Sequence, residues 1–134
     1  MRRAFTLSEL LLAAVIAASV FSAMLLLFMN RLILNEANRN LTQGTSHAQY
    51  VMEEIKDYMV DRQLTSSVIT YIDTNWDLAD PAAVSAQGLR PLESESIAVQ
   101  ATGTDLLDVE VSVNWQDKRG RAYTVSLETL IAEP

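Results

Sequence analysis

An apolar run at residues 10–29 constrains this chain more than any other feature of its sequence. Only Ser19 and Ser22 are polar within it, and neither Gly nor Pro interrupts it. As a helix the run is about 30 Å long, which matches the hydrocarbon core of a bilayer. A cleaved secretory signal has an apolar core of only about 7–15 residues. The run therefore predicts a membrane-spanning helix over residues 5–29.

The basic residues around the run predict its orientation. Arg2 and Arg3 precede it and Arg31 follows it. Because Lys and Arg are retained on the cytoplasmic side, the amino terminus is expected inside and the carboxyl-terminal part outside.

Beyond Arg31 the apolar residues recur at steps of three and four, which predicts an amphipathic continuation of the helix over residues 30–62. The predicted seam consists of Leu34, Ala37, Leu41, Gly44, Ala48, Val51, Ile55 and Tyr58. Gly44 weakens the helix by about 1 kcal/mol relative to Ala, so continuity or a slight bend is expected there. A two-stranded coiled coil is one partner arrangement. The small seam residues favour packing against a sheet or several helices instead.

The sequence pattern of the carboxyl-terminal part, residues 63–134, predicts a small β head. A strand is expected at residues 96–101, an alternating strand at 109–115, a charged turn at 116–121 and a returning strand at 123–131. Residues 67–72 predict a strand or a final structured turn, and residues 73–90 a loop. The fold class is therefore α+β: a long amino-terminal helix packed on an antiparallel sheet of three or four strands, covered by the seam at residues 48–58.

The composition of the chain argues against several kinds of functional site. The net charge of −7 gives no basic footprint for nucleic acid. Cysteine is absent, and His47 is the single histidine, for which a polar surface role is expected rather than metal binding. The acidic stretch at residues 73–77 begins like a calcium loop but lacks the required Gly and Glu, having Leu78 and Val84 there. Trp76 is expected to be an exposed contact residue and Trp115 a core residue.

No nucleophile–histidine pair, phosphate loop or catalytic carboxylate pair is present in the sequence. The chain is therefore predicted to be no enzyme, with neither cofactor nor metal.

Glu9 stands at the mouth of the apolar run and has two interpretations. In an ordinary anchor it stays hydrated at the headgroup boundary. Alternatively, cleavage between Ala4 and Phe5 creates an α-ammonium one helical turn away, and a neighbouring subunit's ammonium offsets the carboxylate in lipid.

The stretch Ala4-Phe5-Thr6-Leu7-Ser8-Glu9-Leu10-Leu11, between a short basic leader and an apolar helix, resembles the processing site of type IV pilins and of type II secretion pseudopilins. The resemblance covers about the first thirty residues. Ala4 stands where that family usually has Gly, and Ser8 where an apolar residue is common.

The resemblance implies that residues 1–4 are a leader, that prepilin peptidase cuts between Ala4 and Phe5, and that the amine of Phe5 is methylated. It also implies that Phe5 and Glu9 pair subunits during assembly. The implied partners are other pilin or pseudopilin subunits, an inner-membrane assembly platform and membrane lipid. The implied location is the bacterial inner membrane, single-pass with a periplasmic head, and then a pilus or pseudopilus filament.

The small head without a disulfide favours a minor member of this family over a major filament subunit. Pilus, secretion and DNA-uptake machines remain open alternatives. The alternative class is a single-span anchor that presents an extracytoplasmic binding module unrelated to filaments. That alternative predicts an intact amino terminus and a harmless Glu9→Ala change.

Overall fold

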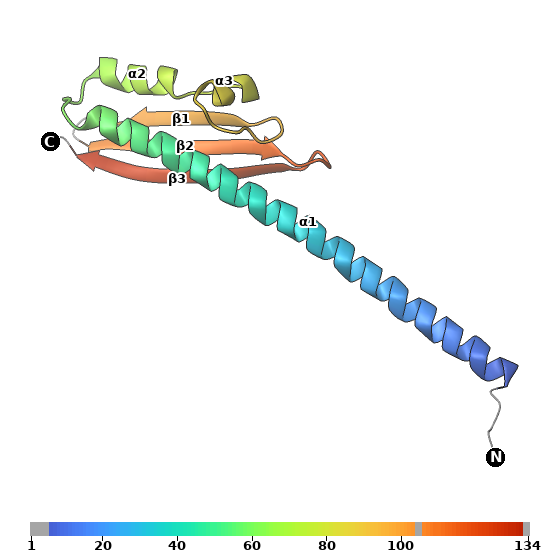
Figure 1. The fold of residues 1–134 in the computed structure, drawn as a ribbon. Coiled ribbons are helices and arrows are strands. Elements are labelled where there is room, and N and C mark those ends of the chain that lie inside the picture. The colour runs from blue at the N-terminus through green and yellow to red at the C-terminus, as the bar shows by residue number, and fades with distance from the viewer. Residues whose placement is uncertain (1–5, 104–105, 133–134) are drawn as a thin grey trace. The chain divides into compact units, whose positions relative to one another are not determined.

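The computed structural model describes residues 6–103 and 106–132, and these form an α+β fold (Figure 1). The helices are α1 (Leu7–Met59), α2 (Ser66–Asn75) and α3 (Pro81–Ala86). The strands are β1 (Ser96–Thr102), β2 (Leu106–Gln116) and β3 (Ala122–Ala132). They form one antiparallel sheet in the order β1-β2-β3. The predicted fold class is confirmed, with three strands.

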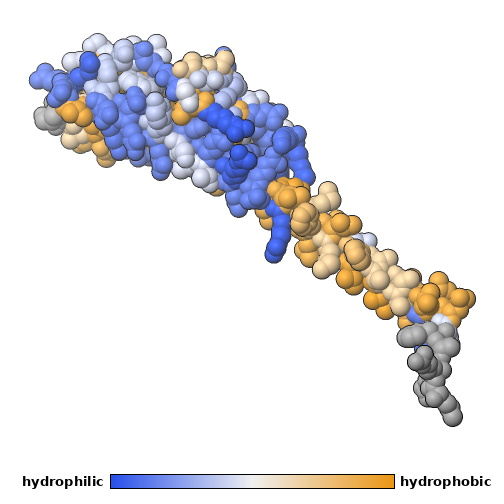
Figure 2. Space-filling model, in the orientation of Figure 1, coloured by the Kyte–Doolittle hydropathy of each residue, from blue (hydrophilic) through white to orange (hydrophobic). Residues whose placement is uncertain are grey.

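The helix α1 is continuous through both parts of the sequence pattern. Its amino-terminal part is long and apolar enough to cross a membrane. Figure 2 shows apolar side chains along that part and hydrophilic side chains over the carboxyl-terminal elements. The chain forms two compact units, residues 1–38 and 39–134.

In the second unit, α1 covers the apolar face of the sheet. Its buried residues are Gly44, His47, Ala48, Val51, Met52, Ile55 and Met59. The inward side chains of the central strand are at most 3% exposed, namely Leu107, Val109, Val111, Val113 and Trp115. Because alternate residues of a strand point to opposite faces, this pattern places one face of β2 entirely in the core. The predicted cover at residues 48–58 and the core position of Trp115 are thereby confirmed.

Two helices replace the strand or turn expected at residues 67–72 and part of the loop expected at 73–90. Thr65 caps α2 by accepting a hydrogen bond from the Val68 N–H group, and Ile72 is buried. The β-branched residues of this segment suggested a strand, but their spacing also places an apolar side on a helix. Asp80 and Pro81 are the N-cap and first residue of α3, a helix-start signal as well as a turn signal.

The turn between β2 and β3 is closed by Asp117. Its carboxylate accepts hydrogen bonds from the backbone N–H groups of Arg121 and Arg119 and from the Arg121 guanidinium. These contacts, the Arg121 backbone first, lower the pKa of Asp117 from 3.8 to about 2. Because the folded pKa lies below the ordinary value, this stabilisation is complete above pH 3.8 and is lost as the pH falls toward 2.

Gly44 lets α1 approach the sheet closely. A Cβ atom at this position would lie 2.8 Å from Cζ3 of the Trp115 ring. That ring is buried and stacks on Tyr123 with a centroid distance of 5.7 Å, so it has little room to move. Close packing therefore explains a glycine that helix propensity alone disfavours.

We predict that Gly44→Ala lowers the free energy of unfolding by about 1 kcal/mol. Overpacking a core costs about 1–3 kcal/mol, which exceeds the roughly 1 kcal/mol gained in helix propensity. Urea unfolding followed by tryptophan fluorescence measures the change. Ser46→Ala, at an exposed position of the same helix, is the control and should stabilise slightly. A stabilised Gly44→Ala variant would show that Trp115 yields easily.

Candidate functional site

The amino-terminal end of α1 is organised by Thr6 and Glu9. The Thr6 N–H group and the Thr6 hydroxyl each donate to Oε2 of Glu9 at 2.9 Å. In return, the Glu9 N–H group donates to Oγ1 of Thr6 at 3.4 Å. This reciprocal arrangement is a capping box, which satisfies backbone donors that the first turn of a helix leaves without partners.

The capping box is a role of Glu9 that neither interpretation from the sequence, hydration or subunit pairing, includes. The signal Thr-x-x-Glu is present in the sequence, but the acid was interpreted only through its relation to the membrane and to Phe5. A carboxylate has about four acceptor positions on two oxygens, so the bonds from Thr6 leave capacity for a cation. Ala4 and Phe5, the two other predicted site residues, lie outside the described residues.

The two polar side chains within the apolar run are satisfied by the helix itself. The hydroxyl of Ser19 donates to the carbonyl oxygen of Ile16 at 2.8 Å, and that of Ser22 to Ala18 at 2.9 Å. Since an unpaired hydroxyl is costly in hydrocarbon, these bonds suit the run to a lipid or helix-bundle environment.

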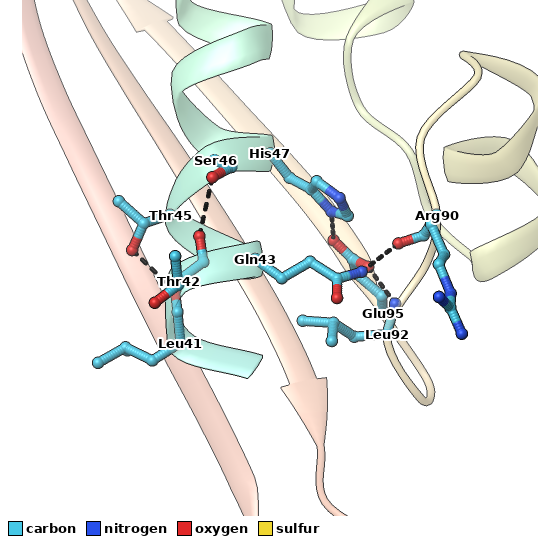
Figure 3. Close-up of polar contacts among 9 residues, drawn as sticks. All are labelled: Leu41, Thr42, Gln43, Thr45, Ser46, His47, Arg90, Leu92 and Glu95. Carbon is cyan, nitrogen blue, oxygen red and sulfur yellow. Dashed lines mark hydrogen bonds and ion pairs between the residues drawn. The ribbon is translucent and has the colours of Figure 1, made fainter. Parts of the chain in front are cut away.

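A buried polar cluster joins α1 to the segment before β1 (Figure 3). Nδ1 of His47 lies 2.6 Å from Oε1 of Glu95, and the residues are 6% and 0% exposed. The Leu92 N–H group donates to Oε2 of the same carboxylate. Close by, the Gln43 amide donates to the carbonyl oxygen of Arg90. These contacts hold the segment between α3 and β1 against α1.

The surface role expected for His47 is therefore wrong. His47 lies three residues after Gly44 and four before Val51, which puts it on the covered side of α1. That spacing was available in the sequence, but nothing in it identified Glu95, 48 positions away, as the partner.

An aromatic cluster joins the end of α1 to α2. The rings of Tyr58 and Tyr71 stack with centroids 4.7 Å apart, and Trp76 meets both edge-on. The Arg62 guanidinium lies 4.0 Å over the Tyr58 ring. Trp76 is half-buried in this cluster, so the expectation of an exposed contact residue is corrected.

Across the described residues, no group of three or more His, Cys, Asp or Glu side chains could hold a metal ion. Among the contacts drawn in Figure 3, the His47–Glu95 pair meets the Leu92 N–H group and no hydroxyl nucleophile, and both residues of the pair are buried. The described residues form a capped apolar helix, long enough to cross a membrane, and a folded α+β unit. This arrangement is consistent with a protein that has a single membrane-spanning segment.

Comparison with known proteins adds no relative: family models, curated proteins and solved structures give no match to this chain.

We predict that His47→Ala lowers the free energy of unfolding by about 3–5 kcal/mol. Removal of one partner of a buried pair leaves the other charge uncompensated, and that charge is Glu95. Urea unfolding of the full chain in detergent micelles, followed by tryptophan fluorescence, gives the value.

The control is the double variant His47→Ala/Glu95→Gln, which removes the stranded charge and should recover part of the loss. An equal loss in both variants would show that packing, and not charge, accounts for the effect.

Proposed function

We propose that this chain is a structural subunit, a minor pilin or pseudopilin, of a type IV pilus-like filament. It is held in a bacterial inner membrane by residues 5–29, with its carboxyl-terminal unit in the periplasm, until it is assembled into the filament. The observation that carries the proposal is the Glu9 carboxylate, held by Thr6 at the start of an apolar helix directly after the Ala4–Phe5 junction.

The proposed assembly step depends on charge. Removal of residues 1–4 by prepilin peptidase creates an ammonium group on Phe5, which is then methylated. A charged residue carried to mid-membrane costs about 2.5–3.5 kcal/mol, and less near the edge. Two opposite charges about 4 Å apart gain about 4 kcal/mol at an effective dielectric constant of 20. The ammonium group of a neighbouring subunit therefore offsets the cost of placing Glu9 in an apolar filament core.

Other features of the chain support the same function. The apolar side chains of α1 from Leu10 to Leu32 are exposed in the isolated chain and suit a bundle of neighbouring helices. Their proposed partners are sibling pilin or pseudopilin subunits, with an inner-membrane platform supporting assembly.

Mass spectrometry of the amino terminus tests the proposal most directly. We expect the mature chain, purified from its membrane, to begin at N-methylated Phe5. A chain that retains Met1 and both leader arginines in the assembled state would favour the membrane-anchored binding module instead.

We predict that Glu9→Gln inserts normally into the membrane but is incorporated into filaments at a reduced level. Gln also completes a capping box, because its carbonyl oxygen accepts the Thr6 N–H, so this variant removes the charge and keeps the cap. Quantitative blotting of membrane and sheared filament fractions measures both steps. Thr6→Ser, which keeps the hydroxyl and the charge, is the control and should assemble normally. Wild-type incorporation of Glu9→Gln would contradict the pairing role.

A further inference from the structure

The two edges of the sheet differ in how their backbone groups are satisfied. On β1, Ile97 exchanges two backbone hydrogen bonds of 2.8 Å with Leu78, and the Ala101 N–H group donates to Oδ1 of Asp73 at 2.8 Å. Preceding segments of the same chain therefore cover the β1 edge at Ile97 and Ala101. Figure 1 shows β3 at the opposite margin, away from α2 and α3.

The register identifies which residues of β3 face the open edge. Ile97 bonds to Leu78, so its backbone groups point away from β2, and its partner Val113 must point toward β3. Val113 pairs with Val125, whose backbone groups therefore point inward to β2. Because bonding direction alternates along a strand, the outward N–H and C=O groups belong to the residues between the inward ones. They are Thr124, Ser126, Glu128 and Leu130.

The apolar side of β3 is also incompletely covered. Tyr123, Val125, Leu127 and Ile131 are half-buried, whereas the inward residues of β2 are at most 3% exposed. A groove of about 330 Å³ lies beside them, between α1 and β3. The α1 residues Met52, Glu53 and Lys56 line it together with Leu127. A strand added beside β3 would direct alternate side chains into this groove.

The acidic side chains on the sheet face opposite α1 indicate which kind of strand could bind beside β3. Glu128 lies directly opposite Glu110, and Asp108 lines the same shallow depression on that face. Like charges directly opposite each other on a sheet are unfavourable. A Lys or Arg next to Glu128 on an added strand would offset this repulsion, while a second copy of this chain, with its net charge of −7, would add to it.

We propose that the open edge of β3 binds an extended segment of a different protein, by β-strand addition. The segment carries a cationic side chain beside Glu128 and apolar side chains facing Leu127. An exposed strand edge is a template for such pairing, in which backbone bonds give affinity and alternate side chains give specificity. This site goes beyond filament assembly and does not depend on Glu9 or on leader cleavage.

The test uses the full chain in detergent micelles and an acetylated octapeptide in which Val alternates with Thr and one central Lys. Amide hydrogen exchange by NMR is the readout. The outward amides of β3 should exchange quickly in the free protein and at least about tenfold more slowly with saturating peptide. The inward amides of Val125 and Leu127 are the internal control and should be protected in both states.

Two variants test the edge and its charge separately. Ser126→Pro removes an outward N–H group and the hydroxyl contact with Ser112, but it leaves the backbone bonds between β3 and β2 intact, so it should weaken peptide binding at least about tenfold. In wild type, a peptide with Glu in place of Lys should bind about threefold more weakly, as expected for an exposed ion pair. Glu128→Lys should reverse that preference, and it keeps the proposal testable if Ser126→Pro does not fold.

Several results would overturn the proposal. Protection of the outward amides in the free protein at low concentration would show that the edge is closed. Protection that rises with protein concentration alone would show that a second copy is the occupant. Equal binding of the Lys and Glu peptides to the wild-type protein would show that charge does not select the occupant. Binding that protects amides other than the outward ones of β3 would show that the peptide binds elsewhere.

Discussion

The carboxyl-terminal unit depends on the contact between α1 and the apolar face of its sheet. A three-stranded sheet has one apolar face that water would otherwise contact, and complete burial of a Val or Leu side chain contributes about 1.5–3 kcal/mol. The inward residues of β2 are almost fully buried because α1 lies over them, and Gly44 allows the close approach at Trp115. Among the helices of the described residues, only α1 is long enough to cover this face, since α2 has 10 residues and α3 has 6.

Apolar packing alone leaves the position of a helix on a sheet weakly specified, since neighbouring registers bury similar areas. The His47–Glu95 pair supplies a directional contact inside the same interface. We interpret its role as fixing where α1 lies along the segment before β1, because a shift by one helical position would strand a buried carboxylate. The Gln43–Arg90 bond adds a second attachment at the same place.

Periodicity in the sequence was sufficient to predict α1 and the sheet, but not α2 and α3. The change from a continuous apolar run to a three-and-four spacing predicted both parts of α1, and strict alternation predicted β2 and β3. The prediction for residues 67–72 was wrong because β-branched residues are compatible both with a strand and with the buried side of a short helix. The pairing of His47 with Glu95 was not predictable for a different reason: the two residues lie 48 positions apart, and only the tertiary fold brings them together.

At the amino-terminal end of α1, the capping box lowers the free-energy cost of placing the Glu9 carboxylate in lipid. A carboxylate without donors would lose its hydration with no replacement on entering an apolar environment. Glu9 already accepts two hydrogen bonds from Thr6, so part of that hydration is replaced within the chain. In the proposed filament, a neighbour's ammonium group would then have to offset only the remaining charge of Glu9 and not the whole desolvation of the carboxylate. Under this proposal, the observed cap and the proposed subunit pairing are complementary uses of one side chain, and the charge-free, cap-forming Gln substitution is the change that separates them.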